Sequence, residues 1–149
     1  MMSGYHELPG DTDEALAGGW VRTGDLGYID PDGDLHYVGR KKEMIKTGGF
    51  SVDPVEVENA ILTLDMAGEA AVLGVEDERW GEMVIAFVSP GPGSVITPED
   101  AIGACRDRIA GYKTPKRVFV VDELPKNPTG KVERGVLRRW YSELTTEGG

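Results

Sequence analysis

The sequence is poor in the residues that form covalent cross-links and metal sites. It has a single cysteine, Cys105, and two histidines among 149 residues. One cysteine excludes a disulfide within the chain and is typical of a reducing compartment, so we expect a cytoplasmic protein. Cys105 lies on the apolar stripe of an expected helix, which favours a core position over a reactive nucleophile. His36 has no second histidine or cysteine near it, so we expect no metal site.

Long apolar runs and an excess of positive charge are also missing. No run approaches the roughly 18 apolar residues of a membrane-spanning helix, and the first residues lack the basic and apolar regions of a signal peptide. We therefore expect no transmembrane segment and no targeting signal. Against 26 acidic residues stand 16 Lys and Arg, a net charge of −10, which disfavours general binding to nucleic acid or an anionic membrane. What is present, 40% hydrophobic and 28% charged residues, is typical of a globular domain.

The stretch 39–49 divides the chain. Before it, residues 1–19 have no convincing period, and two β-prone runs flank a Pro-Asp-Gly turn at residues 31–33, which predicts a hairpin. A hairpin by itself is marginally stable. We therefore expect residues 1–41 to be the end of a larger amino-terminal domain.

Residues 42–145 have the pattern of a complete small domain. Asp53 and Thr97 are expected helix caps, each followed by a proline, and residues 136–144 form a further amphipathic helix. The stretch 39–49 is expected to lead into a first strand with a turn at Gly48 and Gly49, and residues 69–75, 83–89 and 117–121 are further predicted strands. The order β-α-β-β-α-β-α predicts an α+β fold with helices packed on a small three-stranded sheet. Residues 146–149 are expected to be disordered.

Two polar features could carry chemistry. The loop 125–134 combines two prolines, a threonine and a glycine and presents Lys131 near its tip. A lysine ammonium can hold a carboxylate and a phosphate oxygen together while charge builds between them. Asp25 lies on a tight turn and could accept hydrogen bonds from vicinal hydroxyls. From each feature alone, a solvated lysine and a turn-capping aspartate are the simpler interpretations.

Four ordered motifs change that balance. They are residues 19–27 (Gly-Trp-Val-Arg-Thr-Gly-Asp-Leu-Gly), 39–49 (Gly-Arg-Lys-Lys-Glu-Met-Ile-Lys-Thr-Gly-Gly), 54–58 (Pro-Val-Glu-Val-Glu) and 125–131 (Pro-Lys-Asn-Pro-Thr-Gly-Lys). Together they resemble the carboxy-terminal motifs of the adenylate-forming superfamily. That superfamily includes acyl-CoA synthetases, the adenylation domains of peptide synthetases and firefly luciferase. The resemblance covers residues 4–141.

The resemblance implies a two-step reaction. A carboxylic acid attacks the α-phosphate of ATP to give an acyl-adenylate and pyrophosphate, and the thiol of CoA then displaces AMP. It also implies a role for each matching residue: Lys131 stabilises the adenylation transition state, Asp25 binds the ribose hydroxyls, Arg40 lies beside the same sugar, Lys42 is the hinge, and Gly48 and Gly49 line the pantetheine tunnel. Lys131 and the glycine pair would serve one active site in turn, through rotation about Lys42.

Further expectations follow from the resemblance. ATP, with its Mg²⁺, would be held mainly by a large amino-terminal domain, so the chain alone is expected to be inactive. Basic residues between Arg106 and Lys116 could reach the phosphates of CoA. Residues 43–50 resemble acyl- or aryl-CoA ligases, which predicts a fatty-acid–CoA ligase. Two alternatives remain: an adenylation domain that loads a carrier protein, and a binding module without catalytic activity.

Overall fold

The computed structural model describes residues 3–146, which belong to two compact units. Unit 1 ends at Lys42 and unit 2 begins at Glu43. This junction lies one residue beyond the boundary expected from the sequence. Within the described residues, no helix is both long and apolar enough to cross a membrane.

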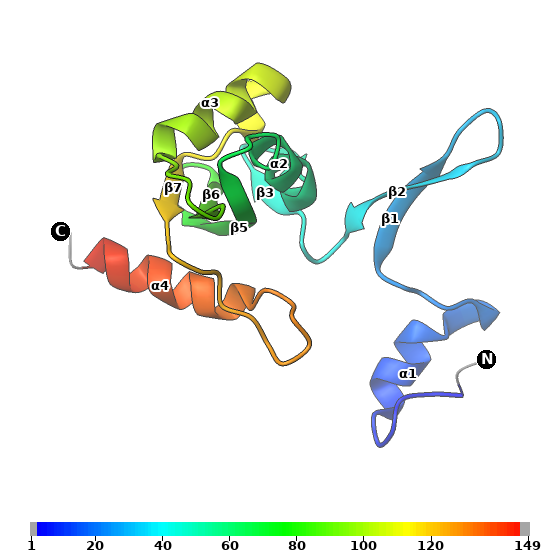
Figure 1. Ribbon diagram of the computed structural model, residues 1–149. Coiled ribbons are helices and arrows are strands. Elements are labelled where there is room, and N and C mark those ends of the chain that lie inside the picture. Colours follow the sequence, from blue (N-terminus) through cyan, green and yellow to red (C-terminus); the bar gives the residue numbers. More distant parts are fainter. Residues whose placement is uncertain (1–2, 147–149) are drawn as a thin grey trace. The chain divides into compact units, whose positions relative to one another are not determined.

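Unit 1 consists of short elements (Figure 1). They are the helix α1 (Pro9–Ala15), the 3₁₀ turn η1 (Ala17–Gly19) and the antiparallel hairpin of β1 (Asp25–Ile29) and β2 (Leu35–Arg40). The hairpin confirms the sequence-based prediction. Helix α1 was not predicted, because none of its residues is buried and an apolar period is therefore absent. Its one sequence signal is Pro9 at the first helical position.

The hairpin is organised by Asp30 at its turn. One carboxylate oxygen of Asp30 accepts hydrogen bonds from the backbone N–H groups of Asp32 and Asp34, at 3.0 and 2.9 Å. The other lies 2.6 Å from His36 Nε2, and this hydrogen bond is the main reason that the pKa of Asp30 is lowered. The His36 ring also stacks on Tyr28, with ring centroids 4.9 Å apart. His36 is thus part of the hairpin's own structure.

Unit 2 contains a mixed sheet of five strands. They are β3 (Ile45–Thr47), β4 (Phe50–Val52), β5 (Ala67–Asp77), β6 (Gly81–Pro90) and β7 (Arg117–Val120). Strands β5 and β6 form a long antiparallel hairpin, β7 joins β6 in parallel, and β3 contacts the start of β6 through Thr47 and Gly81. The α+β class is confirmed, but the count of three strands was wrong. The strand expected before the Gly48-Gly49 turn is β3, whereas β4, after the turn, has only three residues, too few for a recognisable period-two pattern.

Three helices complete unit 2. They are α2 (Pro54–Ile61), α3 (Pro98–Arg108) and α4 (Arg134–Thr146), with the short 3₁₀ turn η2 (Gly111–Lys113) after α3. The Asp53 side chain caps α2, and Thr97 forms a reciprocal capping box with Asp100 on α3. Helix α4 includes Thr146, so the expectation of disorder over residues 146–149 was wrong for that residue. Residues 147–149 lie outside the described part of the chain.

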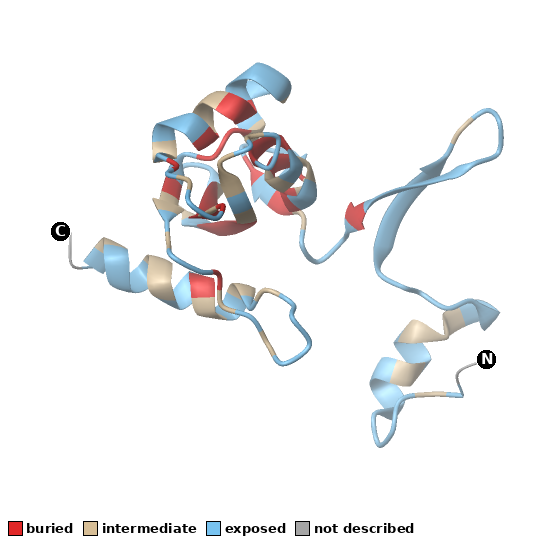
Figure 2. Ribbon diagram, in the orientation of Figure 1, coloured by how far each residue is buried: buried red, intermediate tan, exposed pale blue. Residues whose placement is uncertain are grey.

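The core of unit 2 lies on both faces of the sheet, as the alternation along β6 shows. Val84, Ala86 and Val88 pack with α2 and α3, whereas Ile85 and Phe87 pack with Leu137 of α4. Figures 1 and 2 show α2 and α3 on one side of the sheet, α4 on the other, and the buried residues between them. Cys105 is a fully buried member of the first cluster, and burial raises the pKa of its thiol to about 11. The expected core role of Cys105 is confirmed.

Candidate functional site

Lys131 lies on a closed loop between β7 and α4. The loop narrows where Lys126 and Val132 form an antiparallel bridge, and the N–H of Glu133 donates to the carbonyl of Pro125 at 2.8 Å. Gly130 turns the chain with a φ of 80°, a conformation that side chains disfavour. Lys131 itself is exposed, and no carboxylate of residues 3–146 forms an ion pair with its ammonium group. The group is therefore available to a ligand.

The interior of the loop is occupied by the side chain of Asn127. Its Oδ1 atom accepts hydrogen bonds from the backbone N–H groups of Thr129 and Lys131, at 3.0 and 2.9 Å, and from the Thr129 hydroxyl at 2.7 Å. The backbone N–H of Asn127 donates to the carbonyl of Lys131 at 2.9 Å. Our sequence analysis assigned no role to Asn127, although its place four residues before Lys131, between two prolines, is the kind of position at which asparagine organises turns.

Both ends of the loop are tied to β5. At its start, Lys126 Nζ lies 2.6 Å from Glu69 Oε1. After its end, Arg134 forms an ion pair with Glu58 at 2.9 Å and donates to the carbonyl of Val72. These contacts hold the loop against the sheet.

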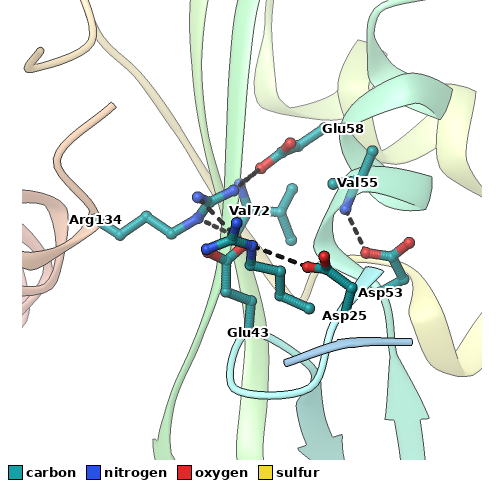
Figure 3. A network of polar contacts seen from close by, with 8 residues as sticks. Asp25, Glu43, Asp53, Val55, Glu58, Val72 and Arg134 are labelled. Atoms are coloured by element: carbon teal, nitrogen blue, oxygen red, sulfur yellow. Dashed lines mark hydrogen bonds and ion pairs between the residues drawn. The ribbon is translucent and has the colours of Figure 1, made fainter. Parts of the chain in front are cut away.

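Glu58 is the acceptor at the centre of this second anchor. Its carboxylate accepts hydrogen bonds from the N–H of Val72 at 2.9 Å and from the Arg134 guanidinium (Figure 3). A carboxylate oxygen of Glu43 lies 3.7 Å from the same guanidinium. Burial raises the pKa of Glu58 above its ordinary 4.5, although the hydrogen bond from Val72 and the charge of Arg134 act in the opposite direction. The sequence did not reveal this pair, because its members are 76 residues apart.

In unit 1, two of the predicted nucleotide-binding residues lie side by side. Asp25 and Arg40 face each other across the β1–β2 hairpin, with Arg40 Nε 3.2 Å from Asp25 Oδ1. The Thr23 hydroxyl accepts from the backbone N–H of Asp25 at 3.1 Å. Because the ion pair uses one carboxylate oxygen, the other is available to accept hydrogen bonds from a ligand.

The other predicted residues lie at or after the junction of the units. Lys42 is exposed and is the last residue of unit 1. Gly48 and Gly49 form the β3–β4 turn with positive φ angles of 55° and 84°. The N–H of Gly48 donates to the Trp80 carbonyl, and a Cβ on Gly48 would lie 3.0 Å from the Trp80 ring, whereas Gly49 has open space. The aromatic cover over Gly48 was not predicted.

A pocket of about 290 Å³ is lined by residues from the last turns of α3 and from the segment that follows it. Its lining includes Arg106 and Lys116 together with Thr114, whose buried hydroxyl has no hydrogen-bond partner among the described residues. Lys113 is engaged elsewhere, because its ammonium group lies 2.6 Å from both carboxylate oxygens of Glu56. No group of three or more His, Cys, Asp or Glu side chains within residues 3–146 is arranged to hold a metal ion.

The α+β unit with helices on both faces of its sheet, together with the loop that carries the 125–131 motif, defines a carboxy-terminal domain of an adenylate-forming enzyme. The chain belongs to the AMP-binding enzyme C-terminal domain family, whose model matches residues 56–131.

Several CoA ligases match almost the whole chain. The long-chain-fatty-acid–CoA ligase FadD13 of Mycobacterium tuberculosis is 40% identical over 142 residues, which are 95% of this chain and 28% of that protein. The o-succinylbenzoate CoA synthetase MenE of Bacillus subtilis, solved with its acyl-adenylate intermediate, is 33% identical with a TM-score of 0.85, and the match covers 93% of this chain and 28% of MenE.

A second similar structure contains ATP. ATP-bound MatB from Rhodopseudomonas palustris is 37% identical with a TM-score of 0.83, and the match covers 95% of this chain and 28% of MatB. The chain thus spans little more than a quarter of the length of the proteins it matches. The resemblance to the adenylate-forming superfamily noted from the motifs is confirmed.

Proposed function

We propose that this chain is the carboxy-terminal part of an ATP-dependent acyl-CoA synthetase, which converts a carboxylic acid, ATP and CoA into acyl-CoA, AMP and pyrophosphate. The observation that carries the proposal is the anchored loop that presents an exposed Lys131 on a domain of the AMP-binding family. A large amino-terminal domain of the same enzyme would supply the rest of the active site. Similarity to FadD13 supports a fatty acid as the acid substrate.

Lys131 acts in the first half-reaction. Attack of the carboxylate on the α-phosphate brings two anionic groups together, and negative charge grows on the phosphoryl oxygens. An ammonium group with three donors offsets that charge when the loop holds it in place before the reaction. The exposed position of Lys131 on a loop with both ends fixed meets this requirement.

Asp25 and Arg40 bind the nucleotide. The carboxylate oxygen of Asp25 that Arg40 does not use accepts hydrogen bonds from the two ribose hydroxyls. The ion pair fixes the orientation of that carboxylate, and Arg40 lies beside the same sugar. The pairing of these two side chains across one hairpin supports their assignment to one ligand.

Gly48 and Gly49 act in the second half-reaction. A turn without side chains lets the pantetheine arm of CoA approach the backbone closely. Rotation of unit 2 about Lys42 exchanges this turn for Lys131 at the active site. Arg106 and Lys116, which line the pocket after α3, are placed to bind CoA phosphates. Charge reversal at these two residues should raise the KM for CoA, and an unchanged KM would remove this assignment.

The test is the variant Lys131→Ala in the complete enzyme. We expect acyl-adenylate formation from acid and ATP to fall by about 10²- to 10³-fold, the usual cost of losing one donor to a developing charge. Thioester formation from supplied acyl-adenylate and CoA should be retained. The two rates are measured separately, as pyrophosphate release and as acyl-CoA formation.

Arg139→Ala is the matched control, because Arg139 is an exposed cation on α4 outside the loop. It should leave both half-reactions unchanged. An equal loss of both half-reactions in Lys131→Ala would refute the role given to Lys131.

A further inference from the structure

The tip of the Lys131 loop cannot owe its shape to packing. Pro128, Thr129, Gly130 and Lys131 are all exposed, and none belongs to either core cluster. An exposed loop of this kind ordinarily samples many conformations, since no buried apolar area offsets the entropy of ordering it. Its conformation must therefore come from hydrogen bonds within the loop.

Those hydrogen bonds converge on Asn127. Its Oδ1 accepts from both N–H groups that point into the loop, at Thr129 and Lys131, and its backbone N–H and carbonyl pair with Lys131 and Gly130. The backbone of Lys131 is thus held on two sides by one residue, through its N–H to the Asn127 side chain and through its carbonyl to the Asn127 backbone. An alanine at position 127 would keep the second contact and lose the first.

We propose that Asn127 is a positioning residue for adenylation, whose Oδ1 holds the Lys131 backbone so that the ammonium group meets the reacting phosphate. This inference rests on the role proposed above for Lys131. Catalytic groups must be held close to their productive geometry, and a displacement of about 1 Å can cost about 10²-fold in rate. Asn127 acts through Lys131 and touches no substrate itself.

The anchors at the two ends of the loop separate this role from a general effect on folding. Lys126 bound to Glu69 and Arg134 bound to Glu58 attach the loop to the sheet independently of the Asn127 side chain. Loss of Oδ1 therefore loosens the tip and leaves the domain folded. Only the step that uses Lys131 should then suffer.

The experiment compares Asn127→Ala with Asn127→Asp in the complete enzyme. Aspartate keeps an acceptor oxygen at the position of Oδ1, so it should restore most of the activity that alanine loses. For Asn127→Ala we expect the kcat of acyl-adenylate formation to fall by about 10- to 100-fold. The KM for ATP and the rate of thioester formation from supplied acyl-adenylate should not change.

Amide hydrogen exchange provides a readout that does not depend on activity. In Asn127→Ala, peptides covering residues 125–133 should exchange faster, while those of β5 and the Tm of the enzyme stay as in the wild type. Parallel loss of both half-reactions together with a lower Tm would overturn the inference, because it would show a purely structural role.

The result for Lys131→Ala separates this inference from the proposed function. If Lys131→Ala abolishes adenylation and Asn127→Ala leaves it at the wild-type rate, the proposed function stands and the positioning role of Asn127 is wrong. If Lys131→Ala itself adenylates normally, the role of Lys131 is refuted, and the reason for positioning it is refuted too.

Discussion

At the scale of single residues, the two neighbouring glycines of the β3–β4 turn are not equivalent. Both have positive φ angles, but Gly48 faces the Trp80 ring and Gly49 faces open space. A residue with a side chain at either position would have to adopt an unfavourable backbone conformation, which costs free energy. At Gly48 it must also displace an aromatic ring.

This difference predicts unequal effects of the same substitution. Gly48→Ala and Gly49→Ala should each lose about 1 to 2 kcal/mol of unfolding free energy from the backbone conformation. Gly48→Ala should lose about 1 kcal/mol more from the contact with Trp80. Urea denaturation of the chain measures both, and Gly49→Ala is the matched control. Equal losses would show that the Trp80 ring moves aside without cost.

The sequence made single residues visible as candidates but did not show their partners. Asp25, Arg40 and Lys131 were all identified through motifs, and the ion pair between Asp25 and Arg40 became evident only from the hairpin register. Asn127 was overlooked, although asparagine between two prolines is a turn signal, because the backbone groups that its side chain accepts from are visible only in the folded loop. Cys105 was correctly assigned to the core, because a helical apolar stripe is a strong signal of burial.

At the scale of elements, the open edge of β5 is closed by an ion pair instead of another strand. Strand β5 has one neighbour, β6, in the sheet. At Val72 on its other side, Glu58 accepts the N–H and Arg134 donates to the carbonyl. An exposed strand edge invites pairing with other chains, so this arrangement also protects β5.

Removing one member of that pair should destabilise the domain asymmetrically. Arg134→Met leaves a carboxylate that is only 15% exposed without its counter-ion, and we expect a loss of about 1 to 3 kcal/mol. Glu58→Gln should cost less, because its side-chain oxygen still accepts from Val72 and Arg134. Denaturation at neutral pH compares the two variants; an equal or larger loss in Glu58→Gln would contradict the prediction.

The pH dependence has a definite sign. Because the pKa of Glu58 in the folded protein is raised above 4.5, proton binding at Glu58 stabilises the folded state. This stabilisation is fully present below pH 4.5 and is lost as the pH rises through the folded pKa. Without Arg134 that pKa rises further, so the Arg134→Met variant loses more on the same rise. Its deficit relative to the wild type should therefore shrink on acidification, which denaturation at several pH values measures.

Elements with strong local signals could be predicted, and the others could not. The capped helices α2 and α3 and the apolar strands β5 and β6 follow from the sequence alone. Helix α1 has no buried face, and β4 is only three residues long, so neither element has a recognisable apolar period. Glu56, three residues after the Asp53 cap, does not complete a capping box on α2 and binds Lys113 instead, a tertiary contact between residues 57 apart.

At the scale of the whole molecule, the two units differ in how many buried apolar residues they contain. Both apolar clusters belong to unit 2, whereas Gly39 is the one buried residue among residues 3–42. Large apolar side chains of unit 1 are exposed: Trp20 80%, Leu35 77%, Ile29 70% and Tyr37 62%. This exposure supports the proposal that residues 1–41 complete a larger domain, and the separate core of unit 2 supports the proposal that it moves as one body.

Restricting the hinge should therefore separate the two half-reactions. In Lys42→Pro, the fixed φ of proline removes the backbone freedom that rotation requires. We expect the complete enzyme to keep acyl-adenylate formation and to lose thioester formation, the reverse of Lys131→Ala. Lys42→Ala keeps that freedom and is the control. A proline variant that makes thioester at the wild-type rate would show that the pivot lies elsewhere.

The anchoring of the Lys131 loop to β5 also has a consequence for folding during synthesis on the ribosome. Glu58, Glu69 and Val72 precede in the sequence the loop that depends on them, and β5 pairs with its sequence neighbour β6. The loop finds its anchors only when that hairpin is already in place and α4 has emerged. We therefore expect Lys131 to be among the last groups of this domain to be set in position.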